Sequence, residues 1–168
     1  ATGSIGTNVL RVVSAFPGRF CVVGLAGGRN VDVLASQIAE YRPAVVSVAD
    51  AAALEALSRL VDLSGTFALV GEPGMVEVAT HPKASMVVAS AVGAVGLVPT
   101  YRALDAGKDV ALANKETLVM AGELMLARAR ETGARLLPID SEHCALHECL
   151  EGRRPEDVRR LVLTASGG

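Results

Sequence analysis

The sequence has no apolar run long enough to cross a membrane. The longest candidate, residues 84–99, is interrupted by Gly93 and Gly96 and is shorter than the roughly 18 residues that a spanning helix needs. We read it as a buried strand followed by a turn. The first residues, ATGSIGTN, contain no basic stretch of the kind that opens a secretory signal. We therefore expect no membrane partner.

The sequence also has few cysteines and a small net charge. The three cysteines are an odd number, which argues against a disulfide framework and for a reducing, cytoplasmic location. The net charge of −2 gives no sign of a nucleic-acid partner. Four arginines do gather near the end, but acidic residues separate them, so this stretch is typical of a solvated surface. They are Arg153, Arg154, Arg159 and Arg160.

Short apolar runs alternate with helical patterns along the chain. Predicted strands occupy residues 20–26, 44–49, 67–70, 86–90, 109–113, 135–139 and 158–165. Predicted helices occupy residues 4–16, 30–41, 51–61, 73–80, 95–106 and 115–132, with Asn30 and Asp50 as N-caps and Gly107 and Gly133 just past helix ends. The strands are continuously apolar, which is typical of a parallel sheet covered by helices on both faces. The predicted fold class is α/β, with a doubly wound, mostly parallel sheet.

Two helical patterns predict core packing. In residues 4–16 the spacing places one set of apolar side chains on a single face. This set is Ile5, Val9, Val12, Val13 and Phe16. In residues 118–126, LVMAGELML, the Met and Leu spacing also predicts packing in the core rather than contacts with a cofactor.

A glycine-rich turn precedes the first helix. In residues 2–6, TGSIG, Gly3 and Gly6 are three residues apart. Such glycines let the backbone approach a pyrophosphate, whose charge is stabilised at the helix N-terminus. Turn glycines before a helix are common, so the motif alone leaves an ordinary turn open. In dinucleotide-binding folds this loop follows a central strand, and we expect that strand to precede Ala1.

The next glycine-rich turn indicates which dinucleotide would bind. Residues 26–30, AGGRN, follow the second predicted strand, where an NAD site usually presents an acid to the ribose 2′-hydroxyl. Here Arg29 and Asn30 stand instead, and residues 21–31 contain no acid. The planar guanidinium fork suits a 2′-phosphate. The turn favours NADP, with an ordinary exposed arginine as the alternative.

Residues 111–125 carry a second candidate site. Asn114, Lys115 and Glu116 follow a predicted strand and open a helix, which is where open α/β sheets bind ligands. A lysine in the first helical turn is unfavourable to the helix dipole, which hints at an accompanying anion.

Residues 136–150, LLPIDSEHCALHECL, allow three interpretations. Zinc would use imidazole and thiolate ligands, but the azimuths of these residues on a helix diverge. Asp140 and Glu142 could ligate Mg²⁺ or Mn²⁺ through oxygen. From the residues alone, the favoured interpretation is that Asp140 is an N-cap and Glu142 lies in the first helical turn. The zinc ligands would be His143, Cys144, His147 and Cys149.

Six motifs in this order and spacing resemble the 1-deoxy-D-xylulose 5-phosphate reductoisomerase family over essentially the whole chain. They are TGSIG, AGGRN, GLVPTYRALDAGK, LANKETLVMAG, LLPIDSEHCA and LTASGG. The resemblance implies an NADP-dependent oxidoreductase of isoprenoid precursor biosynthesis. It would rearrange and reduce 1-deoxy-D-xylulose 5-phosphate to 2-C-methyl-D-erythritol 4-phosphate, with NADPH and Mg²⁺, Mn²⁺ or Co²⁺, as a homodimer.

The resemblance also implies roles for individual residues. The cofactor-binding residues are Thr2, Gly3, Ser4, Ile5, Gly28, Arg29, Asn30, Asn114 and Glu116. The substrate-binding residues are Lys115, Ser141, Glu142 and Ser166, of which Lys115 and Glu142 are also assigned to catalysis; the metal ligands are Asp140 and Glu142. Arg29 stands where relatives often carry Lys, and Cys144 where they usually carry Asn.

The resemblance implies an incomplete chain as well. We expect an NADPH-binding domain over residues 1–139, without its first strand, and the beginning of an α+β catalytic domain over residues 140–168. A third metal carboxylate, further phosphate-binding residues, a closing loop and a helical domain would follow Gly168. Two alternatives remain: a non-catalytic NADP-binding fragment, and another NADP-dependent sugar-phosphate dehydrogenase.

Overall fold

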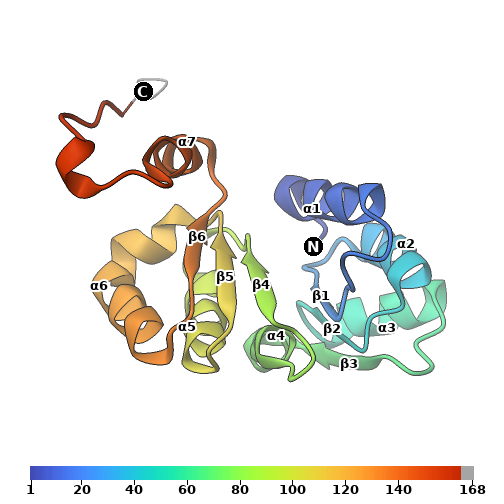
Figure 1. Cartoon of the computed structure of the whole chain (residues 1–168). Helices are drawn as coiled ribbons and strands as arrows, with labels where there is room; N and C mark the ends of the chain where they lie inside the picture. The colour runs from blue at the N-terminus through green and yellow to red at the C-terminus, as the bar shows by residue number, and fades with distance from the viewer. Residues whose placement is uncertain (164–168) are drawn as a thin grey trace.

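Two three-stranded parallel sheets form the framework of the chain (Figure 1). The structure is a computed structural model, which describes residues 1–163. The first sheet has the order β1-β2-β3, with β1 Gly24–Ala26, β2 Val45–Val48 and β3 Phe67–Val70. The second has the order β4-β5-β6, with β4 Met86–Ala89, β5 Asp109–Leu112 and β6 Leu136–Pro138. The α/β class with parallel strands is therefore confirmed.

The helices are α1 Ser4–Ala15, α2 Val31–Tyr41, α3 Ala51–Leu60, α4 Gly71–Thr80, α5 Leu97–Asp105, α6 Lys115–Thr132 and α7 Ser141–Leu150, with short 3₁₀ turns at Gly93–Gly96 and Pro155–Asp157. Helices α2 to α6 connect successive strands, as a parallel sheet requires, while α1 precedes β1 and α7 follows β6. The predicted caps are confirmed: the side chains of Asn30 and Asp50 accept backbone hydrogen bonds at the starts of α2 and α3. Gly107 and Gly133 have φ of 69° and 76°, the left-handed conformation that ends a helix.

Each sheet has its own apolar core. The first core joins α1, α2 and α3 to the first sheet through residues such as Leu10, Leu34 and Leu57. The second joins α5 and α6 to the second sheet through Leu104, Val110 and Met125. Helix α4 contacts all three strands of the first sheet and also α5, and it lies between the two halves in Figure 1. It therefore holds the two sheets together.

Two predicted strands differ from the observed ones. The strand expected at 20–26 is confined to Gly24–Ala26. Among residues 20–23, only Val23 bonds toward β2, and its carbonyl oxygen accepts from the amides of Ala44 and Val45. The prediction of a strand over 158–165 is wrong for the described part, residues 158–163. A strand needs a neighbour for its backbone groups, and no other described strand pairs with this segment.

The predicted apolar faces of α1 and α6 are only partly buried. In α1 the buried residues are Gly6 and Leu10, whereas Ile5, Val12 and Phe16 are exposed. In α6, Met125 is fully buried, but four large apolar side chains of residues 118–126 are exposed. These are Val119, Met120, Leu124 and Leu126. The helix is kinked at Ala121, and buried residues occur on both sides of the kink, Thr117 before it and Met125 after it.

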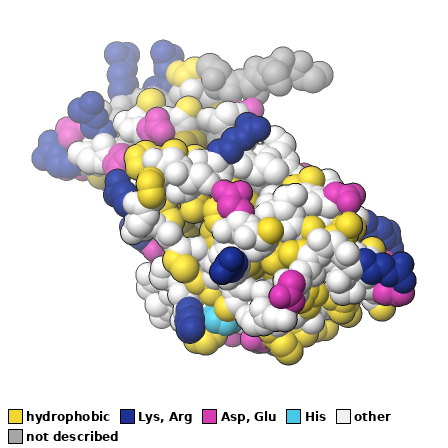
Figure 2. Space-filling model, turned by 90° about the vertical axis from the view of Figure 1, so that its right-hand side faces the viewer, with side chains coloured by type: hydrophobic (Ala, Val, Ile, Leu, Met, Phe, Trp, Pro, Cys, Tyr) yellow, Lys and Arg dark blue, Asp and Glu magenta, His cyan; other side chains and the backbone are white. Residues whose placement is uncertain are grey.

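Charged side chains are mixed on the surface. Figure 2 shows, on the face viewed, Lys and Arg interspersed with Asp, Glu and apolar side chains rather than gathered into a field of one sign. Among residues 1–163, no helix is both long and apolar enough to cross a membrane. The predicted domain boundary at residue 139 and the predicted strand before Ala1 stay predictions.

Candidate nucleotide and metal site

Gly3 forms the turn that starts α1. Its backbone is extended, with φ −84° and ψ 175°, and its carbonyl oxygen accepts from the Thr7 amide at 2.9 Å and the Thr7 hydroxyl at 3.0 Å. No side chain caps the amide groups of this helix start, and its first turn holds no acid. A Cβ on Gly3 would meet open space. The helix start, which includes Ser4 and Ile5, is thus suited to a phosphate group.

Close backbone packing holds this turn beside the carboxyl end of β1. A Cβ on Gly6 would collide with the backbone of Ala1, whose backbone nitrogen donates to the Ala26 carbonyl. A Cβ on Gly27 would lie 2.9 Å from Leu34 and 3.4 Å from the methyl group of Thr2. The structure therefore brings the first glycine-rich turn against the second, as a dinucleotide site needs.

The second turn holds an ion pair. Nε and Nη2 of Arg29 donate to one oxygen of Asp50, at 3.1 Å and 2.6 Å. The Arg29 side chain is still 81% exposed, so it is accessible to a ligand. The Gly28 carbonyl accepts from Ala49 at 3.2 Å. Asn30 caps α2, its side-chain oxygen accepting from Val33 at 3.4 Å.

Asn114 connects the ends of β4 and β5. Its side-chain oxygen accepts from the Thr117 amide at 3.3 Å, and its amide nitrogen donates to the carbonyls of Ala91 and Gly93. The residue is only 4% exposed, so its side chain is committed to structure. Both amide hydrogens are used, so a direct contact with a cofactor would be made through the second lone pair of the side-chain oxygen. That contact stays a prediction, whereas the neighbouring Lys115 and Glu116 are exposed.

The start of α7 carries the acidic segment. Asp140 caps this helix by accepting from the His143 amide at 3.0 Å and lies 2.7 Å from the His143 ring nitrogen. Burial works to raise the pKa of Asp140, but the hydrogen bonds and charge of His143 outweigh it, and the pKa lies below its usual value. The cap interpretation of Asp140 is therefore confirmed.

Glu142 lies in the first turn of α7 and is half-buried. The pKa of Glu142 is lowered first by its own backbone N–H, then by the hydroxyl of Ser141, and further by the charge of Lys115. At neutral pH Glu142 is therefore ionised.

The described residues supply two carboxylates for a cation. Among residues 1–163, no three His, Cys, Asp or Glu side chains gather as a metal site would require. Mg²⁺ keeps several waters and is often held by one or two carboxylates together with its substrate, and the assignment of Asp140 and Glu142 as its ligands stays a prediction. A hydrogen bond to Glu148, followed by burial, raises the pKa of the Cys144 thiol, which disfavours the thiolate that zinc binds.

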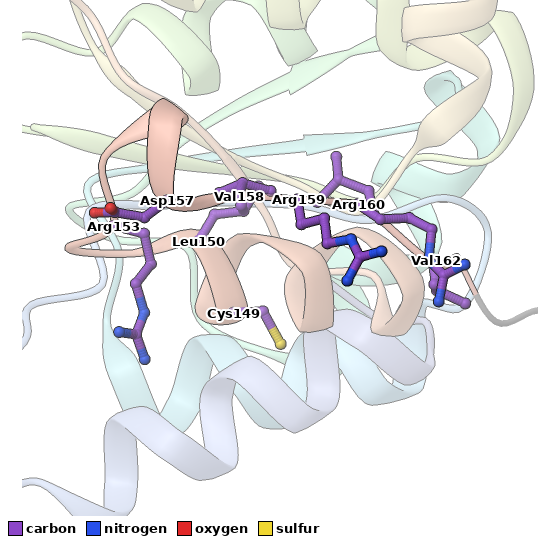
Figure 3. Close-up of a pocket in the computed structure, with 9 residues that line it drawn as sticks. Cys149, Leu150, Arg153, Asp157, Val158, Arg159, Arg160 and Val162 are labelled. Carbon is purple, nitrogen blue, oxygen red and sulfur yellow. The ribbon is translucent and has the colours of Figure 1, made fainter.

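A groove of about 800 Å³ lies at the opposite end of α7. Figure 3 shows Cys149 and Leu150 on the helix, and Arg159, Arg160 and Val162 on the extended segment beside it. None of the predicted site residues lines this groove. Ser166, the last predicted substrate contact, lies outside the described residues.

The sequence identifies Asp50 only as an N-cap, whereas the structure also pairs it with Arg29. The ion pair could have been inferred from strand order, because Asp50 follows β2, Arg29 follows β1, and these two strands are neighbours in the sheet. The sequence also gives no indication of the two bonds that Asn114 donates, because the carbonyls of Ala91 and Gly93 lie in a turn that no motif marks.

Comparison with known proteins identifies the family. The family described as 1-deoxy-D-xylulose 5-phosphate reductoisomerase matches residues 1–122, and the C-terminal domain of that enzyme matches residues 136–168. The chain is 53% identical to the reductoisomerase of Symbiobacterium thermophilum and 54% identical to that of Anaeromyxobacter dehalogenans. These alignments cover all of this chain but only 44% and 43% of the relatives.

Solved structures agree with this assignment. The reductoisomerase of Zymomonas mobilis in complex with NADPH has a TM-score of 0.84 and 38% identity, over 90% of this chain and 40% of that chain. A reductoisomerase in complex with NADPH, fosmidomycin and magnesium has a TM-score of 0.84 and 39% identity, over 90% and 37% of the two chains. The chain thus spans less than half the length of the relatives that it matches, and it belongs to the 1-deoxy-D-xylulose 5-phosphate reductoisomerase family.

Proposed function

We propose that the complete protein converts 1-deoxy-D-xylulose 5-phosphate to 2-C-methyl-D-erythritol 4-phosphate by rearrangement and NADPH-dependent reduction, with a divalent cation. The observation that supports this most is the convergence of the Gly3 turn and the Arg29 turn at the carboxyl end of β1. A relative whose structure contains NADPH shares this fold over 90% of the chain.

The cofactor would lie across the two glycine-rich turns. The amide groups at the start of α1, around Thr2, Gly3, Ser4 and Ile5, would bind the pyrophosphate, because no side chain occupies them. Gly28, Arg29 and Asn30 would hold the adenosine end, with the guanidinium on the 2′-phosphate. Asn114 would position the loop that leads to Lys115, and Glu116 would contact the cofactor.

Substrate and metal would bind where α6 and α7 begin. Asp140 and Glu142 would hold Mg²⁺, Mn²⁺ or Co²⁺, which when bound supplies Lewis-acid polarisation of a ketone oxygen. Glu142 is ionised and so acts as an acceptor, and Ser141 beside it can donate to a substrate oxygen. Lys115 would stabilise negative charge that develops on the substrate, in a region already polarised by Glu142. Ser166 would be a further substrate contact.

A turnover assay of the complete gene product tests this proposal. NADPH should be oxidised only when 1-deoxy-D-xylulose 5-phosphate and Mg²⁺ or Mn²⁺ are both present. Oxidation without the sugar phosphate, or no oxidation with all three components, would contradict it.

A second function is favoured by one observation: residues 1–163 present two candidate metal carboxylates and no third. The 168-residue chain by itself would then be a non-catalytic NADP-binding module. Calorimetric titration of this chain with NADPH, followed by the turnover assay, distinguishes the two. Binding without turnover supports the module, and turnover by the 168-residue chain excludes it.

The remaining expectations concern partners and location. Residues 1–163 have free cysteines, Cys21 and Cys149 being exposed, which favours a reducing compartment such as the cytoplasm. The family resemblance supports a homodimer of the complete protein that binds neither nucleic acid nor membrane. Light scattering of the purified complete protein tests the dimer.

A further inference from the structure

We infer that Asp50 is a positioning residue for Arg29, and that it strengthens the preference for NADPH over NADH. Asp50 would not touch the cofactor. It would fix the guanidinium at the place where the 2′-phosphate binds. The inference rests on the proposed function, in that Arg29 must face the 2′-phosphate.

The geometry of the ion pair leaves the phosphate-binding edge of Arg29 free. A guanidinium has five N–H donors in a rigid plane, which form two forks. Arg29 uses the Nε and Nη2 fork on Oδ2 of Asp50, at 3.1 Å and 2.6 Å. The second fork, made by Nη1 and the other Nη2 hydrogen, is not used by Asp50. The carboxylate and a phosphate can therefore bind the same guanidinium without competing for a donor.

Asp50 is itself fixed. Its other oxygen, Oδ1, accepts from the Ala53 amide at 2.9 Å and so caps α3. The neighbouring residue, Ala49, donates to the Gly28 carbonyl at 3.2 Å, which ties this turn to the one that carries Arg29. Hydrogen bonds from the Ala53 amide and then from Arg29 lower the pKa of Asp50, so the anchor is charged at neutral pH.

An anchored guanidinium loses less freedom when the phosphate binds. The Arg29 side chain is 81% exposed, so without Asp50 it would sample many rotamers. Immobilising such a side chain on binding has an entropic cost, which the anchor reduces. NADH has no 2′-phosphate to bind Arg29, so its affinity should not depend on the anchor. Asp50 should therefore change the ratio of the two affinities rather than both together.

Two variants remove the anchor and retain the helix cap. Asn and Ser cap helices about as well as Asp, but D50N has no negative charge for Arg29 and the side chain of D50S is too short to reach it. In the complete gene product both should weaken NADPH binding about three- to tenfold, measured by fluorescence titration, and change NADH binding less than about twofold. D62N is the matched control, because Asp62 is an exposed acid whose hydrogen bonds within residues 1–163 come from the backbone and hydroxyl of Ser64.

A double-mutant cycle with R29A separates this inference from the proposed function. If Asp50 acts through Arg29, D50N should have no effect on NADPH affinity in the R29A background. Unchanged or tighter NADPH binding by D50N and D50S, an equal loss for NADH, or the same loss in the R29A background would each overturn the inference. If R29A itself leaves NADPH affinity unchanged, then the proposed role of Arg29 fails instead.

Discussion

The side-chain amide of Asn114 donates a hydrogen bond of 2.9 Å to the carbonyl oxygen of Gly93. This bond spans the turns that follow β5 and β4, at the edge of the sheet where Lys115 begins α6. A Cβ on Gly96 would lie 2.9 Å from the same amide nitrogen. The position of Lys115 is therefore set by a buried polar residue that bonds both the turn after β4 and the start of α6.

Replacement of Asn114 should destabilise the protein strongly. N114A removes a helix cap and leaves the carbonyls of Ala91 and Gly93 without their donor, which should lower the free energy of unfolding by about 2–4 kcal/mol. N30A is the matched control, because Asn30 is an exposed cap and should cost about 1 kcal/mol. Urea denaturation measures both. Equal losses would show that the bonds donated by Asn114 contribute nothing.

Gly3 and Gly6 should respond differently to alanine. G6A places a methyl group against the backbone of Ala1 and should lower stability by about 1–2 kcal/mol. G3A meets open space and should fold normally, but its methyl group would obstruct the pyrophosphate and weaken NADPH binding about tenfold or more. Denaturation and cofactor titration of both variants check this. Wild-type NADPH affinity in G3A would show that the phosphate does not bind at this turn.

The sequence predicted local features better than long-range ones. The caps Asn30, Asp50 and Asp140 follow from side chains that bond amides three residues ahead, so spacing alone reveals them. The bond between Arg29 and Asp50 spans 21 residues, and only the pairing of β1 with β2 brings the two residues together.

The amphipathic faces illustrate the same limit. The spacing in α1 selected Ile5, Val12 and Phe16, whereas the structure buries Gly6 and Leu10. A glycine carries no weight in an apolar pattern, yet here the close approach of Ala1 requires it. In α6 the pattern of residues 118–126 does not indicate the kink at Ala121, and Val119 in this stretch is 85% exposed.

Asp140 and Glu142 should differ from other acids of this region in their effect on metal binding. D140N keeps a capping oxygen, so α7 should remain folded, yet D140N and E142Q should each raise the Mn²⁺ concentration needed for half-saturation at least about tenfold. D157N is the control, because Asp157 pairs with Arg154 away from the site. Electron paramagnetic resonance of Mn²⁺ in the complete gene product gives the affinity directly. An equal shift in all three variants would remove these two residues from the metal site.

The pair formed by Asp109 and Arg135 should make stability depend on pH. Hydrogen bonds from the Arg135 side chain and backbone lower the pKa of Asp109, so its folded value lies below the ordinary value of about 3.9. Its contribution is therefore fully present above that ordinary value and is lost as pH falls toward the lower, folded value. D109N should reduce the loss of stability between about pH 5 and pH 3. Urea midpoints of wild type and D109N at both pH values check this, and parallel curves would contradict it.

The most direct test of the proposed reaction follows the hydride. The complete gene product is incubated with 1-deoxy-D-xylulose 5-phosphate, Mg²⁺ and NADPH that carries deuterium at the transferable position, and the product is identified by NMR and mass spectrometry. The account predicts 2-C-methyl-D-erythritol 4-phosphate, with one deuterium on the carbon that was the aldehyde after rearrangement. An unbranched polyol phosphate, with deuterium on the carbon of the original ketone, would contradict it and show an ordinary sugar-phosphate dehydrogenase.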